Sequence, residues 1–117
     1  MSKRRRGEIW LADLNRRQGT EPGKTRPVLI VQAQPLLDAD HPSTLIVPLI
    51  TNVIDDAEPL RVRLLPTGQL KRRSDLLVDQ LRAIDNRRLI AGPLARLSAT
   101  LIAQIDRAIQ EVLDLHE

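Results

Sequence analysis

Short aliphatic runs, separated by proline and glycine, occupy most of this chain and restrict what it can fold into. Residues 27–32 and 44–50 form two continuous apolar runs rich in β-branched side chains. Runs of this length are typical of strands buried on both faces of a sheet. Residues 60–64 instead alternate between apolar residues and arginine. This alternation predicts a half-buried antiparallel strand with both arginines on its solvent face.

Two more segments read as strands, and two others read as turns. Residues 8–14 are expected to form the first strand, and residues 75–81 are a further strand candidate. Turns are expected at residues 66–68 and at Gly92-Pro93, because proline and glycine favour turn conformations.

The end of the chain has a different period and predicts one amphipathic helix over about residues 98–115. Ser98 is a natural N-cap. Apolar residues then recur every three or four positions, at Leu101, Ile102, Ile105, Ile109, Val112 and Leu113. We therefore expect a single domain over residues 1–117, mainly β with α, with a strand-rich part over 7–96. Its fold should be a small, strongly bent antiparallel sheet or partial barrel with a C-terminal packing helix.

Missing residue types exclude several kinds of site and compartment. The chain has no cysteine, which removes disulfides, thiolate catalysis and cysteine zinc sites and fits a reducing cytoplasm. The basic start lacks an apolar region behind it, so no secretory signal is expected, and no segment is apolar enough to span a bilayer.

Catalysis by paired histidines is not expected, and neither is a metal site. The two histidines are His41, in a proline-flanked loop, and His116, the penultimate residue. Asp55-Asp56 is the nearest approach to a carboxylate cluster and reads as a solvated turn. No cofactor is implied. The chain also lacks Phe and Tyr, which disfavours RNA modules that stack bases on exposed aromatic rings.

The net charge of +3 is modest, but the basic residues are clustered. The clusters are Lys3 to Arg6, Arg16-Arg17, Lys71 to Arg73 and Arg87-Arg88. Such clusters are a reasonable footprint for a polyanion. Taken singly, each is more readily explained as a solvated loop or terminus.

Two apolar runs that are expected to be buried are bordered by polar residues whose side chains could take part in catalysis or binding. Thr25-Arg26 precedes one run and Thr51-Asn52 follows the next. If these runs are antiparallel neighbours, Arg26 and Thr51 converge, and a guanidinium beside a hydroxyl can hold a phosphate and stabilise developing charge. The alternative is that Arg26 pairs with Glu21 or Asp79 while Thr51 only ends its strand.

The segment Asp79-Gln80-Leu81-Arg82 places an acid, an amide and a guanidinium inside an apolar run. One of these side chains could contact RNA bases. Alternatively, Asp79 and Arg82 could form an internal ion pair.

Several of these segments resemble the MazF/PemK/Kid family of toxins. The matching pieces, in order, are residues 6–14, Gly19, residues 25–31, residues 47–51 and residues 79–85, followed by the closing helix. The resemblance spans nearly the whole chain. It implies a small SH3-like barrel, a homodimer, and a sequence-specific endoribonuclease of a type II toxin–antitoxin system.

The resemblance also implies a reaction and a set of partners. Single-stranded RNA, mostly mRNA, is cut without a metal when the substrate's 2′-hydroxyl attacks the adjacent phosphate. The products carry a 2′,3′-cyclic phosphate and a 5′-hydroxyl. A small, acidic, partly disordered antitoxin covers the RNA groove, and DNA is contacted only indirectly, through the antitoxin complex.

Residue roles carry over by position. Arg26 matches the family's general acid and phosphate-stabilising arginine, Thr51 matches its catalytic Thr or Ser, and Asp79 falls where some members use Asp in proton transfer. Expected RNA contacts are Glu21, Lys24, Thr25, Asn52, Gln80 and Arg82.

The chain departs from the family pattern at three positions. Thr20 replaces a functional His of some members, Leu77 stands where one branch has Arg, and Ala83 replaces the usual Thr. Proton transfer therefore falls to Arg26 alone or to Arg26 with Asp79.

A non-enzymatic toxin is the alternative function. The same fold carries gyrase inhibitors of the CcdB type, which act through the end of the C-terminal helix, typically with an exposed Trp. Residues 113–117 contain no Trp, which disfavours this alternative. A purely regulatory DNA-binding role is secondary, because promoter recognition in the resembled family belongs mainly to the antitoxin.

Overall fold

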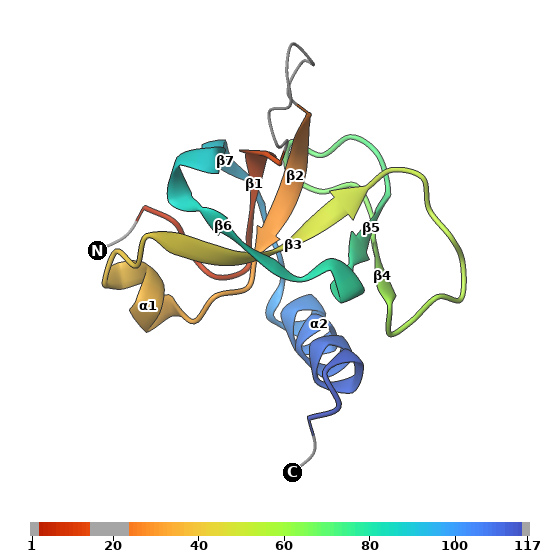
Figure 1. Cartoon of the computed structure of the whole chain (residues 1–117). Helices are drawn as coiled ribbons and strands as arrows, with labels where there is room; N and C mark the ends of the chain where they lie inside the picture. Colours follow the sequence, from red (N-terminus) through yellow and green to blue (C-terminus); the bar gives the residue numbers. More distant parts are fainter. Residues whose placement is uncertain (1–2, 15–23, 116–117) are drawn as a thin grey trace, which may run out of the picture.

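The computed structural model describes residues 3–14 and 24–115, which form a bent antiparallel sheet with one long helix (Figure 1). The strands are β1 (Glu8–Asp13), β2 (Thr25–Ile30), β3 (Ser43–Ile50), β4 (Arg61–Leu64), β5 (Ser74–Leu77), β6 (Arg82–Asp85) and β7 (Leu89–Arg96). The helices are α1 (Gln34–Asp38) and α2 (Ala99–Val112), with 3-10 turns η1 (Val78–Gln80) and η2 (Asn86–Arg88).

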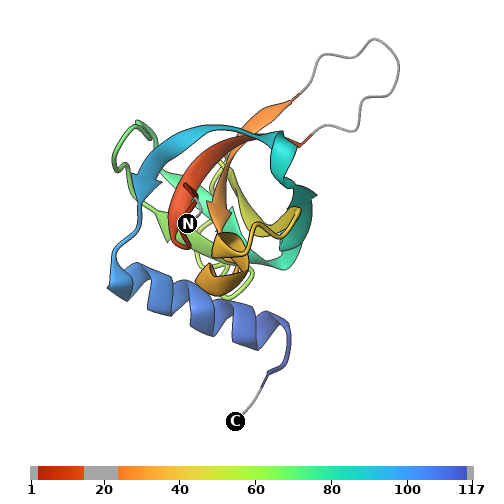
Figure 2. The same ribbon diagram turned by 90° about the vertical axis from the view of Figure 1, so that its left-hand side faces the viewer.

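Strand β3 is the centre of the sheet, whose order is β4-β5-β3-β2-β1-β7. One edge of β3 pairs with β2, and its other edge pairs first with β6 and then with β5. All of these pairings are antiparallel, and the sheet bends over α2 without closing into a complete barrel (Figure 2). The predicted fold class, a bent antiparallel barrel-like sheet with a C-terminal helix, is confirmed.

Two apolar clusters lie on opposite faces of the central strands. The larger packs the sheet against α2 and contains Ile9, Leu29, Val47, Leu49, Val62, Leu64, Leu76, Val78, Ala95, Leu97, Ile105 and Ala108. The smaller contains Ala12, Val28, Ile30, Leu37, Ile46, Ile84 and Leu89. Consecutive strand residues point to opposite faces, so β2 sends Val28 into one cluster and Leu29 into the other. This two-sided burial explains the continuous apolar runs in β2 and β3.

Helix α2 begins where its capping residue predicts. The Ser98 hydroxyl accepts a hydrogen bond from the Leu101 amide at 3.2 Å, which satisfies one of the unpaired amides of the first turn. Ile105 and Ala108 are buried against the sheet. The helix ends at Val112, short of the expected end near residue 115, and the Leu113 side chain is exposed. Within the described ranges, no helix is long and apolar enough to cross a membrane.

Two local predictions were wrong, and one short helix was not predicted. Gly92-Pro93 does not end a strand but lies inside β7, an edge strand with register shifts against β1, where the missing proline amide is tolerated. The expected strand over 75–81 ends at Leu77, and Asp79 lies in the turn η1. Helix α1 was not predicted, because its five residues are too few to show a helical period.

Candidate active site

The ends of β2 and β3 lie side by side, as convergence of Arg26 and Thr51 requires. Val28 pairs with Pro48, and Ile30 pairs with Ile46. Continuing this antiparallel register places Arg26 opposite Ile50, with Thr51 one residue further along β3. The condition for that convergence, antiparallel pairing of the two strands, is therefore met.

A cleft of about 300 Å³ opens over this end of the sheet. Its lining residues come from four stretches of the chain and are Leu14, Lys24, Arg26, Pro48, Leu49, Ile50, Leu77, Gln80 and Arg82. Arg26 belongs to β2, Ile50 to β3 and Arg82 to β6, which pairs antiparallel with β3 (Figure 1). The cleft thus brings together four residues that the sequence predicted for the site, which are Lys24, Arg26, Gln80 and Arg82.

The charged side chains that the structure describes in this cleft are all cations. Among residues 3–14 and 24–115 its lining includes Lys24, Arg26 and Arg82 and no carboxylate. Arg26 is half-buried and forms no ion pair with any residue of the described ranges, so the alternative pairing with Asp79 is absent. Arg82 likewise forms no ion pair with Asp79 there. Guanidinium groups without carboxylate partners in a hollow are suited to bind phosphate oxygens through paired hydrogen bonds.

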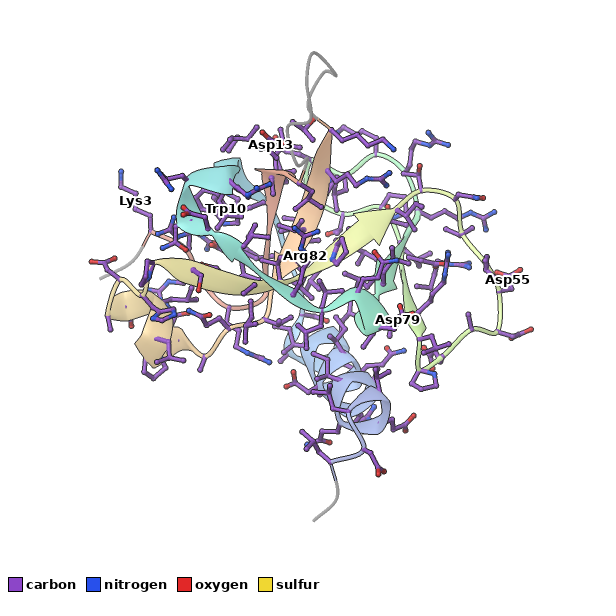
Figure 3. The ribbon with its side chains drawn as sticks, in the orientation of Figure 1. Lys3, Trp10, Asp13, Asp55, Asp79 and Arg82 are labelled. Atoms are coloured by element: carbon purple, nitrogen blue, oxygen red, sulfur yellow. The ribbon has the colours of Figure 1, made fainter. Side chains whose placement is uncertain are left out.

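The remaining predicted residues lie around this cleft or outside the described part. Thr51 and Asn52 are exposed just beyond β3, Thr25 is exposed at the start of β2, and Glu21 lies outside the described residues. No hydrogen bond joins Arg26 to Thr51, both of which are described. Asp79 is exposed in η1 and does not line the cleft, whereas Arg82 lies over the middle of the sheet (Figure 3).

A buried carboxylate beside the cleft escaped the sequence analysis. Asp75, in β5, has a side chain that is 0% exposed. It accepts hydrogen bonds from Arg63 Nε at 2.7 Å, from the Ile54 amide at 2.8 Å and from Arg61 Nη1 at 3.2 Å. Arg63 also donates through Nη2 to Asp55 at 2.8 Å. These four side chains, Asp75, Arg61, Arg63 and Asp55, are called the Asp75 cluster below.

The hydrogen bonds of the Asp75 cluster outweigh the cost of burial. Burial raises the pKa of Asp75. The hydrogen bonds from Arg63, the Ile54 amide and Arg61 together lower it by more than burial raises it, so the net pKa lies below the ordinary 3.8. The same contacts raise the pKa of Arg63. The cluster is therefore an ionised, internally neutral group in the folded protein.

The Asp75 cluster also revises the prediction for β4. Arg61 and Arg63 do lie on one face of the strand, as the alternation predicted, but their side chains are only 22% and 27% exposed. They turn toward Asp75 because β4 and β5 are paired, with Arg63 opposite Asp75. The sequence signal for this cluster is Asp75 itself, an acid within the strand residues 74–77. A charge buried in a strand requires a partner of opposite charge.

Comparison with known sequences gives a consistent result over the whole chain. Residues 5–113 match a family described as PemK-like, MazF-like toxin of type II toxin–antitoxin system. The curated "Endoribonuclease MazF" of Staphylococcus saprophyticus is 36% identical over 114 residues, which cover 96% of this chain and 92% of that protein.

Solved structures share the fold. "Mycobacterium tuberculosis toxin MazF-mt6" superimposes with a TM-score of 0.77 at 22% identity, covering 94% of this chain and 99% of the other. "Crystal structure of MazE-MazF (Form-II) from Deinococcus radiodurans" gives a TM-score of 0.78 at 20% identity, covering 95% and 96%. At these identities the likeness supports the architecture of bent sheet and closing helix.

Proposed function

Because the chain belongs to the PemK-like, MazF-like toxin family of type II toxin–antitoxin systems, we propose that it is an endoribonuclease that cleaves single-stranded RNA, mRNA above all, at the cleft between β2 and β6. The observation that carries this proposal is the charge of the cleft. Lys24, Arg26 and Arg82 line it, and no carboxylate of the described part of the chain does, in a chain related to a curated endoribonuclease. The negatively charged phosphodiester backbone of single-stranded RNA complements such a positively charged surface.

The proposed reaction uses the substrate's own nucleophile. The 2′-oxygen attacks the adjacent phosphorus, the bond from phosphorus to the 5′-oxygen breaks, and the products carry a 2′,3′-cyclic phosphate and a 5′-hydroxyl. Arg26 stabilises the charge that develops on the phosphate oxygens and donates a proton to the leaving 5′-oxygen. Thr51 orients the scissile phosphate from the end of β3. Since Arg26 supplies the positive charge, the proposed reaction needs no metal.

Proton removal from the 2′-hydroxyl is assigned to Asp79. The Asp79 carboxylate is exposed and forms no ion pair within residues 3–14 and 24–115. Asp75, by contrast, is buried and forms ion pairs with Arg61 and Arg63. Asp79 also neighbours Gln80, which lines the cleft. RNA entering the cleft would therefore bring its sugar within reach of η1.

Asp79→Asn is expected to lower kcat and to remove one ionisation from the acid side of the pH–rate profile. The profile is measured by steady-state cleavage of a fluorogenic RNA oligonucleotide between pH 4 and 9. Asp114→Asn, at an exposed position beyond α2, is the control and should leave the profile unchanged. A profile of Asp79→Asn identical to that of the wild type would remove Asp79 from the mechanism.

The other predicted residues are proposed to hold the RNA. Lys24, Gln80 and Arg82 line the cleft, and Thr25 and Asn52 are exposed beside it. Glu21, outside the described residues, is proposed as a further contact. Recognition of the RNA sequence is assigned to residues 15–25, 52–59 and 65–74.

Partners are proposed from the surface and the relatives. Exposed large apolar side chains, which are commonly covered in assemblies, are Leu36, Leu45, Ile54, Leu60, Leu65, Ile90, Leu113 and Leu115. One of the solved relatives is a MazE–MazF complex. We therefore propose a homodimer that binds a cognate antitoxin and contacts DNA only through that complex. The absence of cysteine supports a cytoplasmic place of action.

The reaction is tested by incubating the purified chain with a mixed-sequence single-stranded RNA in excess EDTA. We expect discrete fragments whose 5′ ends accept phosphate from polynucleotide kinase without prior phosphatase treatment, because 5′-hydroxyl ends are produced directly. A gyrase supercoiling assay runs in parallel. Intact RNA together with inhibited gyrase would contradict the proposal and favour the non-enzymatic alternative.

A further inference from the structure

Asp75 is tied to the strand that leads into Thr51. It pairs with Ile50, the last residue of β3, and with Arg63 of β4. Thr51 follows Ile50 directly and is already outside the strand. We propose that Asp75 and Arg61 are positioning residues for RNA cleavage, which hold the segment from Thr51 to Asp55 in its working geometry. This inference rests on the proposed function, because it assigns a role at the same site.

Three contacts from the Asp75 cluster fix the segment. Arg61 Nη1 donates to the Asn52 carbonyl at 3.0 Å. The Ile54 amide donates to Asp75 Oδ2 at 2.8 Å, and Arg63 Nη2 donates to Asp55 Oδ1 at 2.8 Å. The anchors therefore fall on three of the four residues that follow Thr51. Arg61 Nη1 also donates to Asp75 Oδ2, the atom that accepts from the Ile54 amide. Arg61 therefore contacts both the Asn52 carbonyl and the carboxylate that holds Ile54.

The segment has little else to hold it. Thr51, Asn52, Ile54 and Asp55 are all exposed, and none belongs to a helix or strand. An exposed loop without a backbone ladder samples many conformations unless polar contacts restrict it. The buried end of these contacts is rigid, since Asp75 is 0% exposed and lies in a paired strand. The Asp75 cluster thus connects the segment from Thr51 to Asp55 to the rigid sheet and restricts its conformations.

Misplacement of a catalytic group lowers the rate of the chemical step more than it lowers substrate binding. Arg61→Met keeps the aliphatic stem of the side chain but removes the donor to Asn52 and to Asp75, while Arg63 still pairs with Asp75. We expect kcat to fall about tenfold and KM to change by less than twofold. The probe is a fluorogenic oligonucleotide that carries the most frequent cut site mapped in the mixed RNA.

Arg96→Met is the matched control. Arg96 Nε donates to Glu8 Oε2 at 3.0 Å, and the Glu8 side chain is 3% exposed, so this variant also removes one guanidinium from a buried carboxylate. Neither residue of that pair lines the cleft. Comparable loss of stability in urea but unchanged kcat is expected for Arg96→Met. Arg61→Lys, which restores a cationic donor, should recover at least part of kcat.

Amide hydrogen exchange supplies a readout that does not depend on cleavage. The Ile54 amide should exchange slowly in the wild type and in Arg96→Met, but faster in Arg61→Met. Equal kcat in Arg61→Met and Arg96→Met, or unchanged exchange at Ile54 in Arg61→Met, would overturn the positioning role. A wild-type chain that cuts no RNA would instead overturn the proposed function, while exchange at Ile54 would still decide whether the cluster orders the segment.

Discussion

Arg26→Ala is expected to lower kcat for RNA cleavage by roughly a hundredfold or more, with the fold retained. The reason is that a preorganised donor aimed at the developing phosphate charge typically contributes a factor of this size. Arg26 is half-buried at the start of β2 and forms no ion pair with residues of the described ranges, so truncating it orphans no carboxylate there. Initial rates on the oligonucleotide substrate and a urea denaturation curve measure both parts of the prediction.

Two further variants sharpen this test. Arg26→Lys keeps the positive charge but cannot form the paired hydrogen bonds of a guanidinium, so only partial recovery of kcat is expected. Arg107→Ala removes an exposed arginine of α2 and should leave cleavage at the wild-type rate. Cleavage by Arg26→Ala at the wild-type rate would remove Arg26 from the active site.

Asp75→Asn should lower the free energy of unfolding by about 3 kcal/mol at neutral pH, because breaking a buried ion pair from one side leaves the other side uncompensated. Asparagine keeps the volume of the side chain but removes the charge that faces Arg61 and Arg63. Urea denaturation at pH 7 gives the difference between the variant and the wild type.

The effect of Asp75→Asn should depend on pH in one direction. The folded pKa of Asp75 lies below its value in the unfolded chain, which is about 3.9. Its contribution is therefore complete above pH of about 4 and is lost as the pH falls through the folded pKa. The difference between wild type and variant should shrink on acidification. A pH-independent difference for Asp75→Asn would contradict the prediction.

The fold was largely predictable because its periodic signals are long. The runs in β2 and β3 are apolar on both faces, and the structure buries Val28 and Leu29 in separate clusters. The helix α2 carries both a capping serine and an apolar stripe. Elements of this kind are specified by residues close in sequence.

The features that escaped prediction depend on contacts between distant residues or on short segments. Asp75 becomes a cluster centre only because β5 pairs with β4, and nothing within residues 74–78 specifies that pairing. Gly92 lies in β7 where the indole of Trp10 leaves no room for a Cβ atom, a requirement set by a residue far along the chain. A local pattern reads the same Gly-Pro pair as a turn.

The site was predictable in part. Arg26 and Thr51 could be associated because antiparallel neighbours bring strand start and strand end together, and the pairing of β2 with β3 supports that geometry. Gln80 and Arg82 reach the cleft through η1 and β6, although the sequence predicted a strand at Asp79 and Gln80. The catalytic roles themselves remain predictions that the variants above test.

The two-sided burial of β2 and β3 has a consequence for how this protein can change over generations. Arg26 lies in β2, where the following residues Val28, Leu29 and Ile30 belong to the apolar clusters. Substitutions around Arg26 therefore lower the stability of the fold as well as the rate of cleavage. The described segments 52–59 and 65–73 contribute no buried member to either apolar cluster, so fewer substitutions there are penalised twice. Sequence drift should therefore accumulate in the loops, so that descendants can acquire new RNA targets while inheriting the same reaction.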